Sequence, residues 1–212
     1  MLADIDTWVL DLDNTLYPVH LGLADQMNVR IRAYLANLFG TDEAEARRLQ
    51  AELVAEHGTT LRGLMNTRSI DAHDYLAWEH TIDYSVLRPD AVLAEVLGAL
   101  PGRRYVYTNG SAYHAEQVLG RLGLTGCIDG VFDILAAQLI PKPYAASLDA
   151  FLTSYGIDPA RAAMFDDLEV NLAGPHERGM TTVWVSGGTP YEQLAARRWR
   201  VADLPGFLRA NI

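Results

Sequence analysis

The chain has 212 residues, half of them hydrophobic, and 17 Lys and Arg against 27 Asp and Glu give a net charge of −10. This composition is typical of a globular protein and excludes a collagen-like or wholly disordered chain. The negative charge argues against nucleic-acid binding, which needs a basic surface, and against adhesion to anionic lipid. The single cysteine, Cys127, cannot form an internal disulfide, which fits a reducing compartment. We find no signal peptide and no membrane-spanning stretch, so we expect a cytoplasmic protein with no membrane partner.

The first part of the chain combines one strand pattern with a long helical region. Residues 7–11 are short, apolar and β-prone, as in a buried strand. Residues 21–39, 42–56 and about 71–82 have the spacing of helices. No strand pattern occurs among them, so residues 18–85 are predicted to form a small all-helical cap domain inserted after the first strand.

The rest of the chain alternates between strand and helix patterns. Strands are predicted at 104–108, 131–134, 162–165 and 181–185. Helices are predicted at 90–99, 111–122, 144–155 and 169–178, with at least one more helix in the tail. Alternation with short connections predicts an α/β fold, a Rossmann-like parallel sheet with helices on both faces. Residues 1–17 and 86–212 would form this catalytic core.

Ligands of such sheets bind at the carboxyl ends of the strands. The polar side chains expected there are those of Asp11, Asp13, Thr108, Asn109, Lys142, Asp166, Asp167 and Asn171. Four carboxylates at one edge repel one another unless a cation lies among them, and Lys142 offsets only one charge. A hard divalent cation solves this problem, and Mg²⁺ suits an all-oxygen site that serves phosphate chemistry.

The positions of these side chains suggest roles in phosphoryl transfer. Asp11 would be the nucleophile that forms an aspartyl-phosphate, and Asp13 would act as general acid and base. Thr108, Asn109 and Lys142 would hold the phosphoryl oxygens, and Lys142 would neutralise developing charge. Asp167, supported by Asp166 and Asn171, would hold Mg²⁺. The predicted partner is therefore a small phosphorylated substrate.

Four segments carry a resemblance to a known family. Residues 11–18 (DLDNTLYP) resemble the first motif of the haloacid-dehalogenase-like (HAD) superfamily of phosphatases. Thr108 and Lys142 resemble its second and third motifs, and residues 166–171 (DDLEVN) its fourth. The resemblance implies that Mg²⁺ is held by Asp11, by the backbone carbonyl of Asp13 and by the acidic pair. We prefer Asp167 as the direct ligand and place Asp166 on the metal directly or through one water.

A narrower resemblance concerns the substrate. Residues 16–18 (LYP) and 57–64 (HGTTLRGL) resemble the pyrimidine 5′-nucleotidase branch, which implies hydrolysis of UMP or CMP to nucleoside and phosphate. Tyr17, His20 and Arg62 are the candidate substrate contacts. The alternative for Tyr17 is packing in the core, and for Arg62 a solvent-facing position.

Other functions remain open at this point. The same motifs fit a phosphatase for another small phosphomonoester, such as phosphoglycolate or a sugar phosphate, and they fit a phosphomutase. A haloacid dehalogenase on this fold lacks the second aspartate of the first motif, so Asp13 argues against dehalogenation. A catalytically inactive binding protein is disfavoured by the intact set of catalytic residue types.

Overall fold

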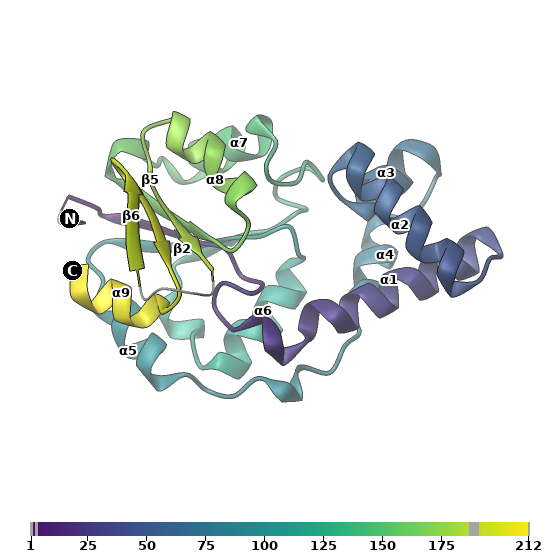
Figure 1. Ribbon diagram of the computed structural model, residues 1–212, viewed down its shortest axis with the longest axis horizontal. Helices are drawn as coiled ribbons and strands as arrows, with labels where there is room; N and C mark the ends of the chain where they lie inside the picture. Colours follow the sequence, from purple (N-terminus) through teal and green to yellow (C-terminus); the bar gives the residue numbers. More distant parts are fainter. Residues whose placement is uncertain (1, 3, 187–190, 212) are drawn as a thin grey trace.

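The computed structural model describes residues 2, 4–186 and 191–211, and one seven-stranded sheet organises them (Figure 1). The strands are β1 (Thr7–Leu10), β2 (Arg103–Tyr107), β3 (Gly130–Phe132), β4 (Ala162–Asp166), β5 (Thr181–Val185), β6 (Tyr191–Ala195) and β7 (Arg198–Val201). Their order is β3-β2-β1-β4-β5-β7-β6, and only β6 runs antiparallel, against β7. The predicted Rossmann-like α/β fold is confirmed, whereas the β6–β7 hairpin was not predicted.

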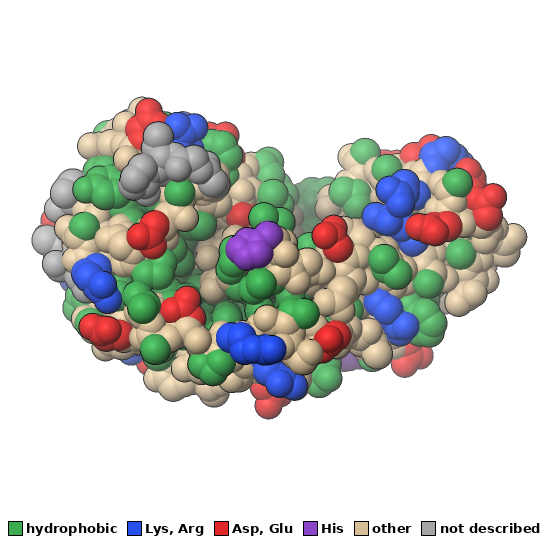
Figure 2. Space-filling view, turned by 60° about the horizontal axis from the view of Figure 1, so that its bottom comes forward, with side chains coloured by type: hydrophobic (Ala, Val, Ile, Leu, Met, Phe, Trp, Pro, Cys, Tyr) green, Lys and Arg blue, Asp and Glu red, His purple; other side chains and the backbone are tan. Residues whose placement is uncertain are grey.

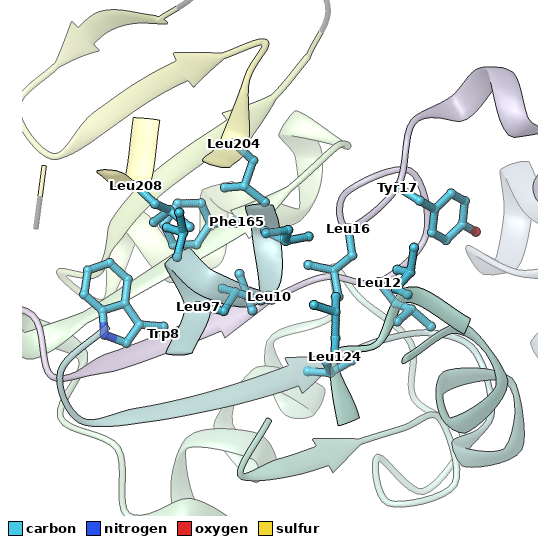
Figure 3. Close-up of a cluster of buried hydrophobic side chains, with 14 of the residues drawn as sticks. Trp8, Leu10, Leu12, Leu16, Tyr17, Leu97, Leu124, Phe165, Leu204 and Leu208 are labelled. Atoms are coloured by element: carbon cyan, nitrogen blue, oxygen red, sulfur yellow. The ribbon is translucent and has the colours of Figure 1, made fainter. Parts of the chain in front are cut away.

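Helices cover both faces of the sheet, as predicted (Figure 1). Helices α5 (Ala91–Ala99), α6 (Ala112–Leu122) and α9 (Leu204–Asn211) lie on one face, and α7 (Ala145–Tyr155) and α8 (Glu169–Glu177) on the other. Alternate side chains of β1 pack on opposite faces of the sheet. Trp8 and Leu10 join the apolar cluster with α5, α6 and α9 (Figure 3), and Val9 joins the cluster with α7 and α8. All three side chains are fully buried, so β1 is the centre of the core.

Four helices between β1 and α5 form a separate group at one end of the sheet (Figure 1): α1 (Leu23–Phe39), α2 (Glu43–His57), α3 (Thr60–Thr67) and α4 (Ala72–Glu79). They share their own apolar cluster, which includes Leu35, Leu64 and Tyr75. The sequence did not predict α3, and the helix predicted at about 71–82 ends at Glu79. The exact division of the chain at residues 18–85 stays a prediction.

The helical group lies beside the carboxyl ends of the strands, and an indentation separates the two lobes of the molecule (Figure 2). Ile134, which follows β3, packs into the apolar cluster of the helical group and joins the two parts. In the part of the chain that is described, no helix combines the length and the apolar character that a bilayer crossing requires.

Candidate active site

The carboxylate of Asp11 lies where β1 ends. Its backbone N–H donates to the carbonyl of Phe165 over 2.8 Å, which continues the pairing of β1 with β4 by one residue. The Asp11 side chain is therefore held at the edge of the sheet, and only 6% of the residue is exposed. Burial raises the pKa of Asp11 to about 8, against the opposing charge of Lys142.

Lys142 is a buried ammonium with all three protons engaged. Its Nζ donates to Asp11 Oδ1 (2.6 Å), to Asp166 Oδ2 (2.7 Å) and to the carbonyl of Tyr107 (2.9 Å). Burial lowers the pKa of Lys142, but the charges of the two aspartates outweigh it and hold the pKa above the ordinary value. Lys142 thus remains charged and ties the ends of β1, β2 and β4 together.

Asp166 and Asp167 differ in how their oxygens are used. Asp166 Oδ1 accepts from the N–H of Leu168 and from Nδ2 of Asn171, both at 2.9 Å, while its Oδ2 accepts from Lys142. Asp167 Oδ2 accepts one long bond from Asn14, 3.4 Å. Burial, with the charge of Asp166, raises the pKa of Asp167 to about 6. Asn171 therefore orients Asp166, and its predicted support of a metal ligand stays a prediction.

Three of these carboxylates form a possible metal site. One oxygen each from Asp11, Asp166 and Asp167 lie within 4.8 Å of one another. An all-oxygen set of acidic ligands suits Mg²⁺. The pKa values of Asp11 and Asp167 are raised because both carboxylates are at least partly buried and lie close to other carboxylates. A bound dication would stabilise their ionised forms. The donors present fit the predicted cofactor.

The carboxylate of Asp13 has a different environment. Tyr17 donates its hydroxyl to Asp13 Oδ1, and His114 Nε2 lies 2.7 Å from the same oxygen. Burial would raise the pKa of Asp13, but the charge of His114 and the bonds from His114 and Tyr17 hold it below the ordinary value. The site therefore keeps an ionised aspartate beside the nucleophile.

The sequence did not predict a role for His114 or for the residues that contact it. His114 is completely buried, and its Nδ1 lies 2.9 Å from the hydroxyl of Tyr84, in the 3₁₀ turn η2 (Tyr84–Val86). His80 stacks on His114 with ring centroids 4.5 Å apart. Ser111 caps α6 by accepting from the N–H of His114, which fixes where His114 lies on the helix. His80 and His114 do not have the sequence spacing of metal ligands. Only their contact in the folded structure identifies them as neighbours of the site.

The predicted phosphate-binding residues lie beside Lys142. Asn109 Oδ1 accepts from the backbone N–H of Lys142 (2.7 Å), and its Nδ2 donates to the Lys142 carbonyl (3.3 Å). Asn109 thereby clamps the backbone of Lys142. Thr108 is buried, and its hydroxyl oxygen accepts from the N–H of Gly110 (2.9 Å), which leaves the hydroxyl proton for another acceptor.

The three candidate substrate contacts have different locations. The Tyr17 ring is buried, and its hydroxyl points away from the apolar cluster (Figure 3) toward Asp13. His20 is exposed in the 3₁₀ turn η1 (Val19–Leu21), on a cavity of about 580 Å³ that also borders Asp167. The Arg62 guanidinium stacks over the Tyr144 ring at 4.2 Å. Arg62 thus joins the cap to the loop after Lys142.

A second cavity, of about 260 Å³, connects Asp13 with the cap helices. Asp13, Asn109 and Gly110 form its core side, and residues of α1, α2, α3 and α4 form its cap side. Of the predicted site residues that the structure describes, Asp13 and Asn109 border this cavity, whereas Tyr17, His20 and Arg62 do not. The cavity lies next to the acid/base candidate, where a leaving group would be.

Comparison with known proteins agrees with this arrangement. A model of the haloacid dehalogenase-like hydrolases matches residues 5–177. Phosphate metabolism protein 8 of Saccharomyces cerevisiae is 29% identical over 80% of this chain, which spans only 58% of that relative's length. A HAD phosphatase from Thermococcus onnurineus has a TM-score of 0.66 at 18% identity, over 97% of both chains. An L-2-haloacid dehalogenase from Xanthobacter autotrophicus has a TM-score of 0.53 at 19% identity, over 85% of this chain and 77% of its own.

These two structural likenesses show the fold alone, because the sequence identities are low. The family match carries more weight, since residues 5–177 include β1 to β4 and α1 to α8, with every carboxylate and lysine described above. The chain belongs to the haloacid dehalogenase-like hydrolase family.

Proposed function

We propose that the protein is a Mg²⁺-dependent phosphomonoester hydrolase that acts through an aspartyl-phosphate on Asp11. The observation that carries this proposal is the pairing of Asp11 with Lys142 at 2.6 Å, beside an acidic cluster and a separately held Asp13. A nucleophile, a charge-neutralising cation and an acid/base are the groups that phosphoryl transfer through an enzyme carboxylate requires.

The proposed metal ligands are Asp11, Asp167 and the backbone carbonyl of Asp13, with Asp166 on the metal directly or through one water. The preference for Asp167 is supported by its single long hydrogen bond, whereas Asp166 already accepts from three donors. When bound, Mg²⁺ neutralises charge on the phosphoryl oxygens and orients the group.

The protein residues carry the two chemical steps. An oxygen of Asp11 attacks phosphorus while the bond to the ester oxygen breaks. Asp13, which is ionised in the free protein, takes up a proton from solvent when the substrate binds and gives that proton to the leaving oxygen. Asp13 then takes a proton from water, whose oxygen attacks phosphorus as the bond to Asp11 breaks. Thr108 holds a phosphoryl oxygen, Lys142 supplies positive charge beside the phosphoryl group from its place on Asp11, and Asn109 keeps Lys142 in place. The products are the alcohol and inorganic phosphate, and the enzyme returns to its starting form.

The presence of Asp13 supports phosphatase rather than dehalogenase chemistry. Removal of a halide from carbon needs no protonation of the leaving group, so a dehalogenase has no use for an acid at this place. Here Tyr17 and His114 hold Asp13 beside the cavity. The name of the yeast relative, a phosphate metabolism protein, is in keeping with phosphate chemistry.

Our preferred substrates are the pyrimidine nucleotides UMP and CMP, on the strength of the LYP and HGTTLRGL segments. Residues 58–61 of the second segment border the cavity next to Asp13, which supports a role in leaving-group recognition. A phosphatase for phosphoglycolate or a sugar phosphate is the second candidate, because the phosphate-binding groups alone do not select the alcohol.

The test is phosphate release with Mg²⁺ from UMP, CMP, dUMP, AMP, GMP, phosphoglycolate and sugar phosphates. Preference for UMP and CMP would support both the proposed reaction and the proposed substrates. Preference for another ester would support the phosphatase reaction but contradict the choice of pyrimidine nucleotides. No release from any ester by the wild type would contradict the proposal. Chloride release from 2-chloropropionate, assayed in parallel, would favour a dehalogenase.

A further inference from the structure

Glu79, the last residue of α4, borders the 260 Å³ cavity together with Asp13 and His80. Its carboxyl forms no hydrogen bond or ion pair with any residue in the described ranges 2, 4–186 and 191–211. Burial and the charge of Asp13 raise the pKa of Glu79 to about 7, against the charge of His114. An acid without a protein partner at the wall of a leaving-group cavity is available to a ligand.

No Lys or Arg side chain occurs among the described residues that line the cavity. Among the described residues that line it, the charged types are Asp13 and Glu79, and the others are apolar, hydroxyl, amide or histidine side chains. His80 does not supply a charge, because burial and the charge of His114 lower its pKa to about 3. Arg32 is nearby, but it lies behind Gln50 and donates to that amide at 3.2 Å.

The amide side chains of the cavity complement the acid. Gln50 Nε2 donates to Asn28 Oδ1 at 2.7 Å, and both residues line the cavity on α2 and α1. The Asn28 oxygen is used in this way, and its NH₂ group, which has no partner among the described residues, remains as a donor of a residue that lines the cavity. The cap side therefore offers an acid acceptor and an amide donor to one small molecule.

We infer that Glu79 selects phosphomonoesters whose leaving group is uncharged and rich in hydrogen-bond donors, such as a nucleoside, and rejects leaving groups that carry a carboxylate or a second phosphate. The inference rests on the proposed phosphatase function and names the residue that decides its substrate class. A hydroxyl or amino donor gains a hydrogen bond to the carboxyl. A carboxylate in the same place meets the acid of Glu79, and no cationic side chain among the described lining residues offsets the repulsion.

The volume agrees with such a leaving group. Small-molecule sites typically enclose roughly 300–1,000 Å³, and this cavity is close to the lower limit. It therefore suits one small polar molecule.

The test compares kcat/KM for UMP, phosphoglycolate and p-nitrophenyl phosphate between the wild type and Glu79→Gln. The nitrophenyl ester reports on the phosphate site independently of leaving-group charge. We expect the wild type to prefer UMP over phosphoglycolate, and the ratio of the two values to fall by about 10-fold in Glu79→Gln. Glu79→Lys should shift the ratio further in the same direction. Glu56→Lys, an equal charge change on the exposed face of α2, is the matched control and should leave the ratio unchanged.

The outcomes separate the two proposals. Turnover of the nitrophenyl ester with an unchanged ratio in Glu79→Gln, or a wild type that prefers phosphoglycolate, would overturn the inference and leave the phosphatase proposal intact. A wild type that hydrolyses none of the three esters would overturn the inference, and a wild type that releases phosphate from no ester of the wider panel would overturn the phosphatase proposal as well.

Discussion

His114 Nε2 lies 2.7 Å from Oδ1 of Asp13, although 101 positions separate the two residues in the chain. An ionised carboxylate is only an acceptor, so the imidazole must donate from Nε2. Tyr17 donates to the same oxygen, and Asp13 Oδ2 has no hydrogen-bond partner among the described residues. The two donors thus fix which oxygen is left to exchange protons with the leaving group and with water.

This relationship predicts a dependence on the leaving group. His114→Gln should lower kcat for UMP, whose alkoxide needs a proton, by about 10- to 100-fold, up to the lower end of the range for complete loss of a general acid. The loss for p-nitrophenyl phosphate should be smaller, because its phenolate leaves without protonation and only the later attack of water depends on Asp13. Parallel measurement of kcat for both esters checks this, with Tyr17→Phe as the companion variant. Equal losses on the two esters would mean that His114 only supports the fold.

The nucleophile assignment makes a simpler prediction. Asp11→Asn keeps the volume of the side chain but removes the carboxylate that attacks phosphorus. Turnover of every phosphomonoester should fall by at least about a thousandfold, as expected when a covalent nucleophile is lost. Phosphate release from UMP and from the nitrophenyl ester, together with a thermal melt to verify folding, is the measurement. Retained activity on either ester would exclude Asp11 as nucleophile.

Lys142 should be as important for stability as for catalysis. Lys142→Met leaves two buried carboxylates, Asp11 and Asp166, without their cation, and breaking a buried pair costs about 3–5 kcal/mol. The metal-free variant should melt roughly 6–20 °C below the metal-free wild type. The deficit should shrink as the pH falls, because a protonated Asp11 needs no counter-ion. A variant as stable as the wild type at high pH would contradict this account of the buried pair.

Mg²⁺ binding should depend on pH. The pKa values of Asp11 and Asp167 are raised, to about 8 and about 6, so protons compete with the metal below these values. In the metal-free protein, ionisation of these groups is unfavourable. Their contribution to the free energy of unfolding is therefore present at low pH and is lost as the pH rises through 6 to 8.

The increase in melting temperature on adding Mg²⁺ should therefore be larger near pH 8 than near pH 5.5, and apparent affinity should change up to about tenfold per pH unit for each displaced proton. Thermal melts with and without Mg²⁺ at both pH values are the measurement. In Asp167→Asn, the dependence around pH 6 should weaken. Full phosphatase activity in excess chelator would contradict the metal site itself.

The elements that the sequence missed share a physical cause. All five residues of β6 (Tyr191–Ala195) are exposed, so no alternation of buried and exposed positions marks it as a strand. Its partner β7 is held by pairing with β5, a contact that no local pattern records. Helix α3 is only eight residues long and contains Thr and Gly, and it is stable because Leu61 and Leu64 are buried against the other cap helices.

The sequence by itself determined the elements that local patterning encodes: a buried strand with Asp11 at its end, a second strand followed by Asp166, and the lysine between two prolines. Strand ends in a parallel sheet converge by topology alone, so their side chains could be placed together without coordinates. The tertiary structure alone decided that Tyr17 and His114 meet on one oxygen of Asp13, that Arg62 stacks on Tyr144, and that Glu79 borders the cavity. Apart from the bond between Tyr17 and Asp13, these relationships bring together residues far apart in the chain, and packing across such distances leaves no periodic trace in the sequence.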